Sequence, residues 1–252
     1  MLTRPDTVAL PLPPAVSPDR NSLFLDFDGT LVSLVDDPDS VHADADLLDL
    51  LNALHARFGS RLAIVSGRSI AQLDHMIGPL AQTITLAGSH GAEIRQDGYL
   101  HEPARPAGLD AAIAEARAFA ALHPAMIVEI KTQGVGLHYR MQPDLETETR
   151  ARARAIGAAH HLYVQPGKMM VELRGPGSDK GDAVKTLVAR APMEDSLPVV
   201  LGDDLTDEPA LACAQALGGF GVLVGAPRAT AADYGLADVA DVRAWLWDMA
   251  KG

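Results

Sequence analysis

The sequence predicts an α/β protein in which a mostly parallel sheet is interrupted by an inserted α+β domain. Short apolar runs alternate with amphipathic helical segments on both flanks of the chain, the pattern of a parallel sheet with helical crossovers. The middle of the chain has two helical segments and two pairs of alternating segments, as in an antiparallel sheet covered by helices. The predicted boundaries are 22–101 and 178–252 for the core, 102–177 for the insertion, and 1–21 for a flexible, proline-rich N-terminal arm.

The predicted core elements follow one another in a strand–helix order. A buried strand at 22–26 runs into the DFDGT turn, and an amphipathic helix over 44–57 follows with acidic residues in its first turn. The next strand, 61–66, leads through SGR to a helix over 69–77, and a third strand covers 83–87. After the insertion we expect a helix over 180–191, strands over 197–201 and 220–224, and a helix over 239–250.

The insertion predicts a sheet with one apolar and one polar face. Helices are expected over 108–122 and 144–161, one hairpin from 125–132 and 135–141, and a second that turns at Pro166-Gly167. Because strand side chains alternate between faces, residues such as Ile130 and Met141 should pack on the helices. The opposite face should collect Glu129, Lys131, His138, Arg140, Lys168, Glu172 and Arg174. Such a face suits a ligand with many hydroxyls, because carboxylates accept hydrogen bonds and Lys or Arg donate them. A solvated surface is the alternative reading.

Composition excludes several classes of protein. The 252 residues carry a formal net charge of −12, which argues against a nucleic-acid partner because phosphate binding needs a basic face. Apolar runs are too short for a membrane span, and the first twenty residues lack the pattern of a secretory signal. The single cysteine, Cys213, excludes an intrachain disulfide. We therefore expect a cytoplasmic protein without a membrane partner; the sequence leaves its oligomeric state open.

Chemically active side chains follow the predicted strands. Asp26 and Asp28 follow the first strand and Ser66 follows the second, while three aspartates follow the strand after the insertion. Ligands of open α/β sheets bind outside the carboxyl ends of the strands, so these residues should converge. Crowded carboxylates need a cation, and an all-oxygen shell suits Mg²⁺. A carboxylate also serves as a nucleophile that forms an aspartyl phosphate.

Four motifs at these positions resemble those of the haloacid dehalogenase superfamily, in the same order. They are DFDGTL at 26–31, SGR at 66–68, Lys180-Gly181 at a helix start, and GDDLTDE at 202–208. The resemblance implies a HAD-like Rossmannoid core with a C2-type cap, and phosphatase activity. It further implies that Asp26 attacks phosphorus, that Asp28 protonates the leaving oxygen and then activates water, and that Ser66 and Lys180 hold phosphate oxygens.

The same resemblance implies the metal and substrate contacts. Mg²⁺ would be bound by Asp26, the backbone carbonyl of Asp28, and Asp203. Asp204 and Asp207 would lie beside these ligands, with Asp207 orienting metal-bound water. The phosphate-side contacts implied for the core are Gly29, Thr30, Gly67 and Arg68.

Further motifs in and near the insertion are similar to the trehalose-6-phosphate phosphatase family. These are AGSHGAE at 87–93, VEIK at 128–131, HYR at 138–140 and GKMMVELR at 167–174. The resemblance implies a sugar phosphate substrate, trehalose 6-phosphate, that is hydrolysed to trehalose and phosphate. Sugar contacts are implied for Glu129, Lys131, Arg140, Lys168 and Glu172.

Three other functions are weighed against this one. A related sugar phosphatase would act on sucrose phosphate or mannosyl-3-phosphoglycerate, and the polar cap face would distinguish them. A phospho-accepting receiver module also uses an acidic pair, but its phosphorylated aspartate ends a later strand, whereas here DxD ends the first strand. A sugar-sensing pseudoenzyme is disfavoured because all four motifs are chemically intact.

Overall fold

The chain divides by its internal contacts into two compact units. The computed structural model describes residues 9–35, 41–175, 177 and 179–251. The core unit comprises Met1–Leu34, Val41–Glu102 and Ser178–Gly252, and the cap unit comprises Val35–Ser40 and Pro103–Gly177. Among the described residues, no helix is both long enough and apolar enough to cross a bilayer.

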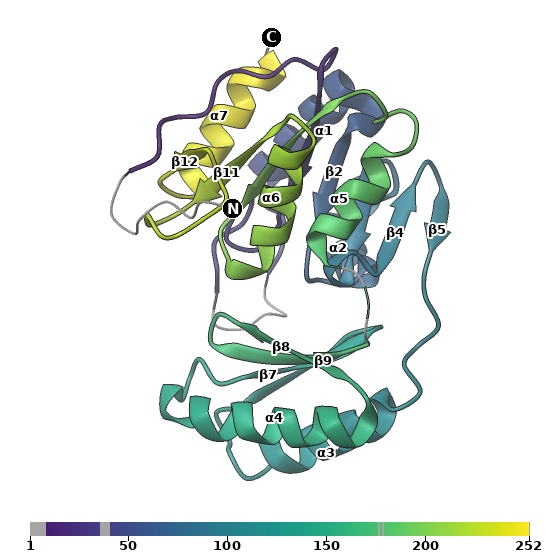
Figure 1. The fold of residues 1–252 in the computed structure, drawn as a ribbon, viewed down its shortest axis with the longest axis vertical. Coiled ribbons are helices and arrows are strands. Elements are labelled where there is room, and N and C mark those ends of the chain that lie inside the picture. The colour runs from purple at the N-terminus through teal and green to yellow at the C-terminus, as the bar shows by residue number, and fades with distance from the viewer. Residues whose placement is uncertain (1–8, 36–40, 176, 178, 252) are drawn as a thin grey trace. The chain divides into compact units, whose positions relative to one another are not determined.

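The core unit is built on an eight-stranded sheet of order β12-β11-β10-β1-β2-β3-β4-β5 (Figure 1). The parallel strands are β1 (Asn21–Leu25), β2 (Leu62–Val65), β3 (Thr85–Gly88), β10 (Leu197–Gly202), β11 (Phe220–Val224) and β12 (Tyr234–Leu236). β4 (Glu93–Gln96) and β5 (Tyr99–His101) add an antiparallel edge. Leu25 lies opposite Leu201 on β10 and Ile64 on β2, so the carboxyl ends of the central strands are level.

Helices cover both faces of this sheet. On one face α1 (Ala45–Phe58), α2 (Ile70–Ile77) and α7 (Val239–Lys251) pack on a cluster that includes Leu23 and Leu25. On the other face α5 (Lys180–Val188) and α6 (Glu208–Ala216) pack on a cluster that includes Phe24 (Figure 1). Consecutive β1 side chains therefore pack against helices on opposite faces of the sheet, which explains the unbroken apolar run in the sequence. Each fully buried Leu or Phe contributes about 1.5–3 kcal/mol to the stability of the fold.

The core sheet differs from the predicted one at its edges. The strands β4, β5 and β12 were not predicted, and β4 and β5 make the sheet mixed. The reason is physical: all three residues of β5 are exposed, so no apolar pattern marks them. Short 3₁₀ helices in the described residues lie near the site or the ends of the sheet at η2 (Gly59–Arg61), η4 (Ser89–Gly91) and η6 (Leu205–Asp207). Further ones are η3 (Gly78–Gln82) and η5 (Pro143–Leu145).

Residues 9–17 of the predicted arm form an irregular segment that packs against the core unit and ends in a turn at 18–20. The side chain of Val16 is buried in the same cluster as Leu23, and Leu10 packs on the opposite cluster. Gly235 also donates its N–H to the carbonyl of Pro11 at 3.0 Å. An irregular proline-rich segment can therefore bury its few apolar side chains against the core unit. The flexibility of the arm stays a prediction, and residues 1–8 lie outside the described residues.

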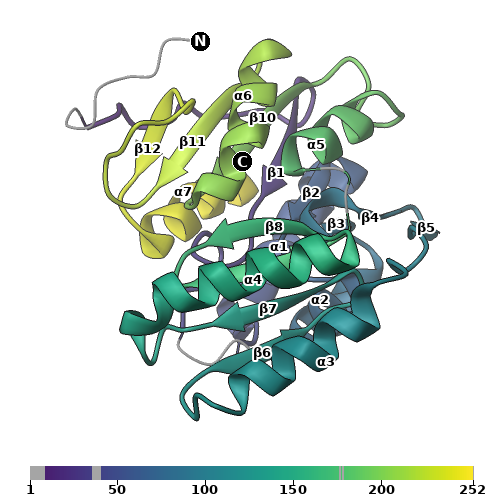
Figure 2. The same cartoon turned by 60° about the horizontal axis from the view of Figure 1, so that its bottom comes forward.

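The cap unit is a four-stranded antiparallel sheet of order β6-β7-β9-β8 with two helices on one face (Figure 2). Its elements are β6 (Ile127–Ile130), β7 (Gly134–His138), β8 (Tyr163–Gly167), β9 (Met170–Arg174), α3 (Leu109–Ala120) and α4 (Glu146–His160). Leu137, Val171 and Leu173 are buried against helix residues such as Ala116 and Ile156. This apolar contact fixes which side chains point to the opposite, polar face.

Two details of the predicted cap are wrong. The second hairpin does not turn at Pro166-Gly167, because Gly167 pairs with Met170 and the turn lies at 168–169, where Met169 has a φ of 60°. Ile130 and Met141 do not pack on the helices, because they are 41% and 58% exposed. Ile130 ends an edge strand and Met141 lies beyond the end of β7, so neither is held on the apolar face.

Candidate active site

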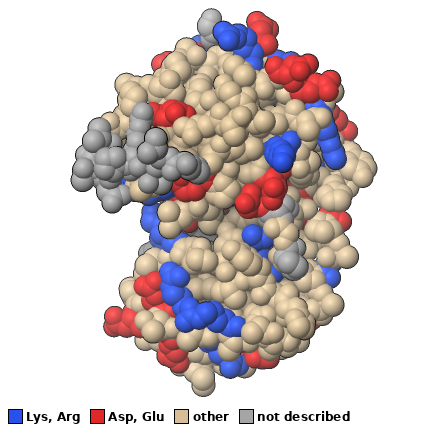
Figure 3. All heavy atoms as spheres, in the orientation of Figure 1, with Lys and Arg blue, Asp and Glu red and all other residues tan. Residues whose placement is uncertain are grey.

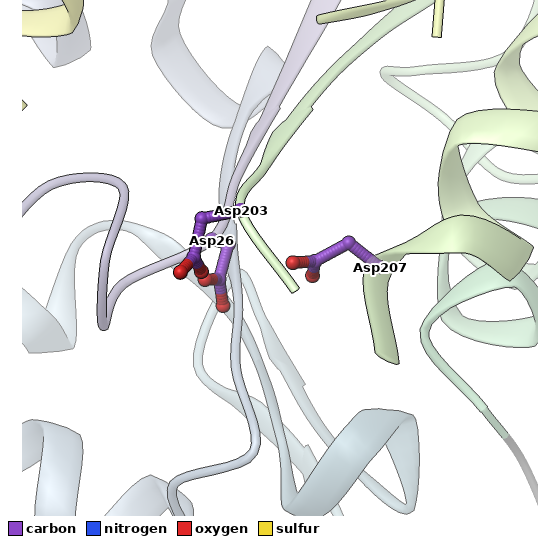
Figure 4. Close-up of side chains that lie close together, drawn as sticks. All are labelled: Asp26, Asp203 and Asp207. Carbon is purple, nitrogen blue, oxygen red and sulfur yellow. The ribbon is translucent and has the colours of Figure 1, made fainter. Parts of the chain in front are cut away.

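Three carboxylates from distant parts of the sequence meet at the carboxyl edge of the core sheet. Asp26 directly follows β1, and its N–H donates to the carbonyl of Leu201 on the neighbouring β10 at 3.0 Å. Asp203 follows β10, and Asp207 lies in η6 (Figure 4). One carboxylate oxygen of each aspartate lies within 4.8 Å of the others. Figure 4 shows the Asp207 carboxylate pointing toward the other two.

Lys180 is the cation of this cluster. It is the first residue of α5, whose N-terminus is capped by the Asp179 carboxylate, and its side chain is only 4% exposed. Its Nζ donates to Asp26 Oδ1 at 2.6 Å and to Asp207 Oδ1 at 2.5 Å. The structure thus joins Lys180 to Asp26, as expected if both act on one phosphoryl group.

Burial and the neighbouring charges act on the pKa values of this cluster in opposite directions. Burial raises the pKa of Asp26 well above its ordinary value; Asp207 and Asp203 raise that pKa further, and Lys180 opposes them. Burial alone would lower the pKa of Lys180, but the carboxylates of Asp207 and Asp26 raise it above its ordinary value. Three carboxylates beside one ammonium group leave an excess of negative charge, which a divalent cation would offset.

Two glycines let the acidic side chains approach. Gly29 has a φ of +85°, and a Cβ at this position would lie 2.3 Å from Asp203 Oδ2. A Cβ on Gly202 would lie 2.3 Å from the Cγ of Asp207. Any larger residue would therefore displace a carboxylate of the cluster, and Gly29 also needs the left-handed backbone that glycine adopts without strain.

The structure pairs Asp28 with Arg68. Arg68 Nε donates to Asp28 Oδ2 at 2.8 Å, and Nη2 donates to Oδ1 at 2.8 Å. The bidentate geometry is the strong form of this ion pair. The resemblance implied that Arg68 contacts the substrate phosphate and that Asp28 protonates the leaving oxygen. A bond between Arg68 and Asp28 was not predicted. Ser66, which is 1% exposed, accepts the N–H of Arg68 through its Oγ at 3.1 Å.

A strained turn supports the loop that carries Ser66 and Gly67. Ser89 and His90 have φ values of 49° and 57°, a conformation that non-glycine residues rarely adopt and that often marks a functional site. The N–H of His90 donates to the carbonyl of Ser66 at 2.9 Å. A Cβ on Gly67 would lie 2.8 Å from the His90 ring, so the ring fits only against glycine.

The remaining predicted core residues have separate places. Thr30 is buried, and its Oγ1 lies 3.5 Å from Asp26 Oδ2. Asp204 accepts the N–H of Leu205 at 2.7 Å and caps η6. The three carboxylates that lie together are those of Asp26, Asp203 and Asp207. The metal contact expected of Asp28 involves its backbone carbonyl, and that contact stays a prediction.

On the cap unit the polar face of the sheet holds a buried charge cluster. Glu129 and Glu172 lie on either side of Gly136 in neighbouring strands. Lys131 Nζ donates to Glu172 Oε2 at 2.6 Å and lies 3.8 Å from Glu129 Oε2. His138 Nε2 lies 2.9 Å from the same Glu129 oxygen. Glu129, Lys131 and Glu172 are each at most 6% exposed, so this part of the face is not an ordinary solvated surface.

Other predicted cap residues lie outside this cluster. Arg140 is half-buried and Lys168 is exposed. Arg174 donates through Nε to Gln165 Oε1 at 2.6 Å and lies over the Tyr163 ring at 5.0 Å from the ring centroid. The structure therefore brings Glu129, Lys131 and Glu172 together, and it does not join Arg140 or Lys168 to them.

Sequence reasoning missed Arg228, which donates hydrogen bonds to the backbone of the segment that follows β10. Its Nη2 donates to the carbonyls of Asp204 at 2.9 Å and Asp203 at 3.4 Å. The available signal was its position just after β11, at the same edge of the sheet as the other site residues. No periodic pattern marks the segment between β11 and β12 that carries Arg228.

On the face shown in Figure 3, basic and acidic side chains lie scattered among uncharged ones.

Comparison with known proteins places this site in a family. The family model described as trehalose-phosphatase matches residues 24–239. The chain is 36% identical to the trehalose-6-phosphate phosphatase of Escherichia coli strain K12 over 88% of this chain and 84% of that protein. It is also 36% identical to a probable trehalose-phosphate phosphatase of Sinorhizobium fredii, over 83% of this chain and 79% of that protein.

A solved structure shares this fold. The crystal structure of a trehalose-6-phosphate phosphatase related protein aligns with a TM-score of 0.79 at 28% identity, covering 91% of this chain and 96% of that one. The predicted fold class, an α/β core with a largely parallel sheet, is confirmed.

Proposed function

Since the chain belongs to the trehalose-phosphatase family, we propose that it hydrolyses trehalose 6-phosphate to trehalose and inorganic phosphate. The predicted phosphatase class is confirmed by the family match. The observation that carries the proposal is the contact of Lys180 with both Asp26 and Asp207 beside Asp203. That group offers a nucleophile, a phosphate-binding cation and a site for a divalent ion.

The first step forms a bond between an Asp26 oxygen and phosphorus. The phosphorus–oxygen bond to the sugar then breaks, and the proton for the leaving oxygen comes from Asp28. In the second step Asp28 takes a proton from water, the water oxygen bonds to phosphorus, and Asp26 is released with inorganic phosphate. Lys180 balances charge on the transferred group because its Nζ already contacts the attacking carboxylate.

The pair between Arg68 and Asp28 has a defined part in this scheme. In the observed pair both carboxylate oxygens of Asp28 are turned to Arg68, so breaking one of these bonds would let that oxygen turn to the leaving oxygen of the substrate. A phosphate group accepts the same two-pronged donation from a guanidinium group. We propose that the phosphate of the substrate binds Arg68 and so frees Asp28, which reconciles the observed pair with the predicted role of each residue.

The three gathered carboxylates fit Mg²⁺. Asp26, Asp203 and Asp207 offer hard oxygen donors within 4.8 Å of one another and carry more negative charge than Lys180 offsets. When bound, the ion would polarise the phosphoryl oxygens and offset charge that develops during transfer. Gly29 and Gly202 keep the space that these side chains need.

The polar face of the cap sheet is proposed to bind the sugar. Glu129 and Glu172 are hydrogen-bond acceptors for hydroxyls, and Lys131 is a donor held between them. Arg140 and Lys168, which lie outside the cluster, are proposed as further donors. Because Lys131 and His138 already hold the two carboxylates in place, little side-chain freedom would be lost when they accept hydroxyl hydrogens.

A panel of phosphate esters tests the proposal. Purified full-length chain is assayed with Mg²⁺ for phosphate release from trehalose 6-phosphate, sucrose phosphate, mannosyl-3-phosphoglycerate and p-nitrophenyl phosphate. We expect the highest kcat/KM with trehalose 6-phosphate, and loss of activity in EDTA that Mg²⁺ restores. A higher kcat/KM with either of the other sugar phosphates overturns the substrate assignment. Full activity after thorough chelation overturns the metal assignment.

A further inference from the structure

Arg228 contacts the loop that carries the acidic cluster from a segment distant in sequence. Its side chain is 24% exposed and lies between β11 and β12. Through Nη2 it donates to the backbone carbonyls of Asp203 and Asp204, and through Nη1 it pairs with the carboxylate of Glu208. Arg228 thus contacts both the first and the last residue of the segment 203–208, which we call the acidic loop.

Glu208 is itself fixed by the segment that carries Arg228. Its Oε1 accepts the Oγ1 hydrogen of Thr230 at 2.8 Å, and its Oε2 accepts the N–H of Ala231 at 2.7 Å. The start of α6 and the segment 228–231 are therefore joined by three donors to the Glu208 carboxylate rather than by a single exposed ion pair. This arrangement gives Arg228 a defined orientation toward the carbonyls of Asp203 and Asp204.

The acidic loop needs such support because it is crowded with negative charge. It carries four carboxylates in six residues, Asp203, Asp204, Asp207 and Glu208. Like charges at this spacing repel one another and favour an open loop. Lys180 opposes that repulsion at Asp207, and Arg228 opposes it at the backbone and at Glu208.

We propose that Arg228 is a positioning residue for the divalent-ion site, holding the Asp203 backbone so that its carboxylate stays beside Gly29 and Asp26. This inference rests on the proposed function, because it concerns the same site. The planar fork of arginine donates to two carbonyls and a carboxylate at once, which the single ammonium group of lysine does not reproduce. Groups that orient metal ligands in this way typically change metal affinity by about 10–100-fold when they are lost.

An opposing electrostatic effect makes the sign of the result informative. Removing a positive charge near a cation site would strengthen cation binding if Coulomb repulsion were the main effect of Arg228. That repulsion is small here, because the guanidinium is paired with Glu208 and partly exposed to screening solvent. We therefore expect the geometric effect to dominate, so that substitution weakens Mg²⁺ binding.

Calorimetric titration of metal-free full-length chain with Mg²⁺ tests this inference without reference to turnover. The variants are Arg228→Gln, which removes charge and fork, and Arg228→Lys, which keeps the charge and removes the fork. The matched control is Arg61→Gln, because Arg61 is also half-buried and donates to two carbonyls, those of Pro192 at 2.9 Å and Pro18 at 2.7 Å, beside the start of β2 at the other end of the sheet. Thermal unfolding of each variant, with and without Mg²⁺, reports the stability of the fold.

The expected result is an increase of about tenfold in the Mg²⁺ Kd for both Arg228 variants. Arg61→Gln should lower Tm and leave the Mg²⁺ Kd unchanged. Three results overturn the inference: unchanged or tighter binding in Arg228→Gln, wild-type binding in Arg228→Lys, or equal weakening in Arg61→Gln. If the wild-type chain itself does not bind Mg²⁺, the metal site fails together with this inference. If the wild-type chain binds Mg²⁺ and both Arg228 variants bind it with the same Kd, only this inference fails.

Discussion

Lys180 Nζ lies 2.6 Å from Oδ1 of Asp26, although 154 residues separate the two in the chain. Both side chains are buried, at 4% and 6% exposure, so water does not stabilise either charge. Each therefore depends on the other and on Asp207, and removal of one partner leaves an uncompensated buried charge. This contact couples the chemistry of the site to the stability of the core unit.

Asp26→Asn should abolish turnover and preserve the fold. The amide is not a nucleophile, whereas it keeps the shape of the side chain, and Lys180 keeps its bond to Asp207. We expect kcat/KM for trehalose 6-phosphate to fall by at least about 10⁴-fold. Phosphate release measures this loss, and circular dichroism checks the fold. Asp97→Asn is the matched control, because Asp97 bonds Ser60 at an exposed site. Retention of substantial activity would exclude Asp26 as the nucleophile.

The same substitution should change how the stability of the metal-free protein depends on pH. Burial raises the pKa of Asp26, so the folded chain holds this proton more tightly than the unfolded chain, whose Asp pKa is about 3.9. The stabilisation that this group provides is full below about pH 4 and is lost as pH rises through the raised pKa.

The free energy of unfolding of Asp26→Asn minus that of the wild type should therefore increase with pH. Urea unfolding in EDTA at a series of pH values measures this difference. A difference that stays constant over the series would contradict the raised pKa.

Gly29→Ala should disable the site, whereas Gly59→Ala should only lower stability. Both glycines have positive φ, +85° and +55°, so alanine at either position costs about 1–3 kcal/mol of backbone strain. Only at Gly29 does the new Cβ collide with Asp203, since nothing lies within 4 Å of a Cβ on Gly59. Displacing that carboxylate should reduce kcat/KM about 10²-fold. Phosphate release and thermal unfolding separate the two effects; equal activity of both variants would argue against a role for the Asp203 position.

Glu172→Ala should reduce turnover of trehalose 6-phosphate more than turnover of p-nitrophenyl phosphate. The substitution removes a proposed hydroxyl acceptor, and a hydrogen bond to a charged group contributes about 1.5–3 kcal/mol, or roughly 10–150-fold. The aryl ester has no sugar and should lose little. The control is Glu148→Ala, an exposed glutamate of α4.

Glu172→Ala also leaves Lys131 without its 2.6 Å partner, so the fold needs a separate check. Glu172→Gln keeps the shape of the side chain, and thermal unfolding compares the two variants. Equal losses with both phosphate esters would assign Glu172 to folding of the cap unit rather than to the sugar.

The strands that the sequence predicts are those with two buried faces. β1 has five buried residues and β2 has four, which produces the apolar runs that mark them. β5 and β12 escaped prediction because each has only three residues and lies at an edge of the sheet, where burial leaves little pattern. β4 escaped prediction because its buried residues are mostly charged, so no apolar run marks it. The turn after β8 was misplaced because Pro166-Gly167 has turn-forming residues, yet the pairing of Gly167 with Met170 extends the hairpin.

The sequence by itself determined that Asp26, Asp203 and Asp207 belong to one site, because parallel strands bring their carboxyl ends to one edge of the sheet. Only the tertiary structure decided which charges are partners: Arg68 with Asp28, Lys131 with Glu172, and Arg228 with the acidic loop. Those pairs join residues 20 to 41 positions apart, as 228 and 208, 68 and 28, and 172 and 131. These pairs form because the fold packs the two side chains together, and no periodic pattern in the sequence predicts them.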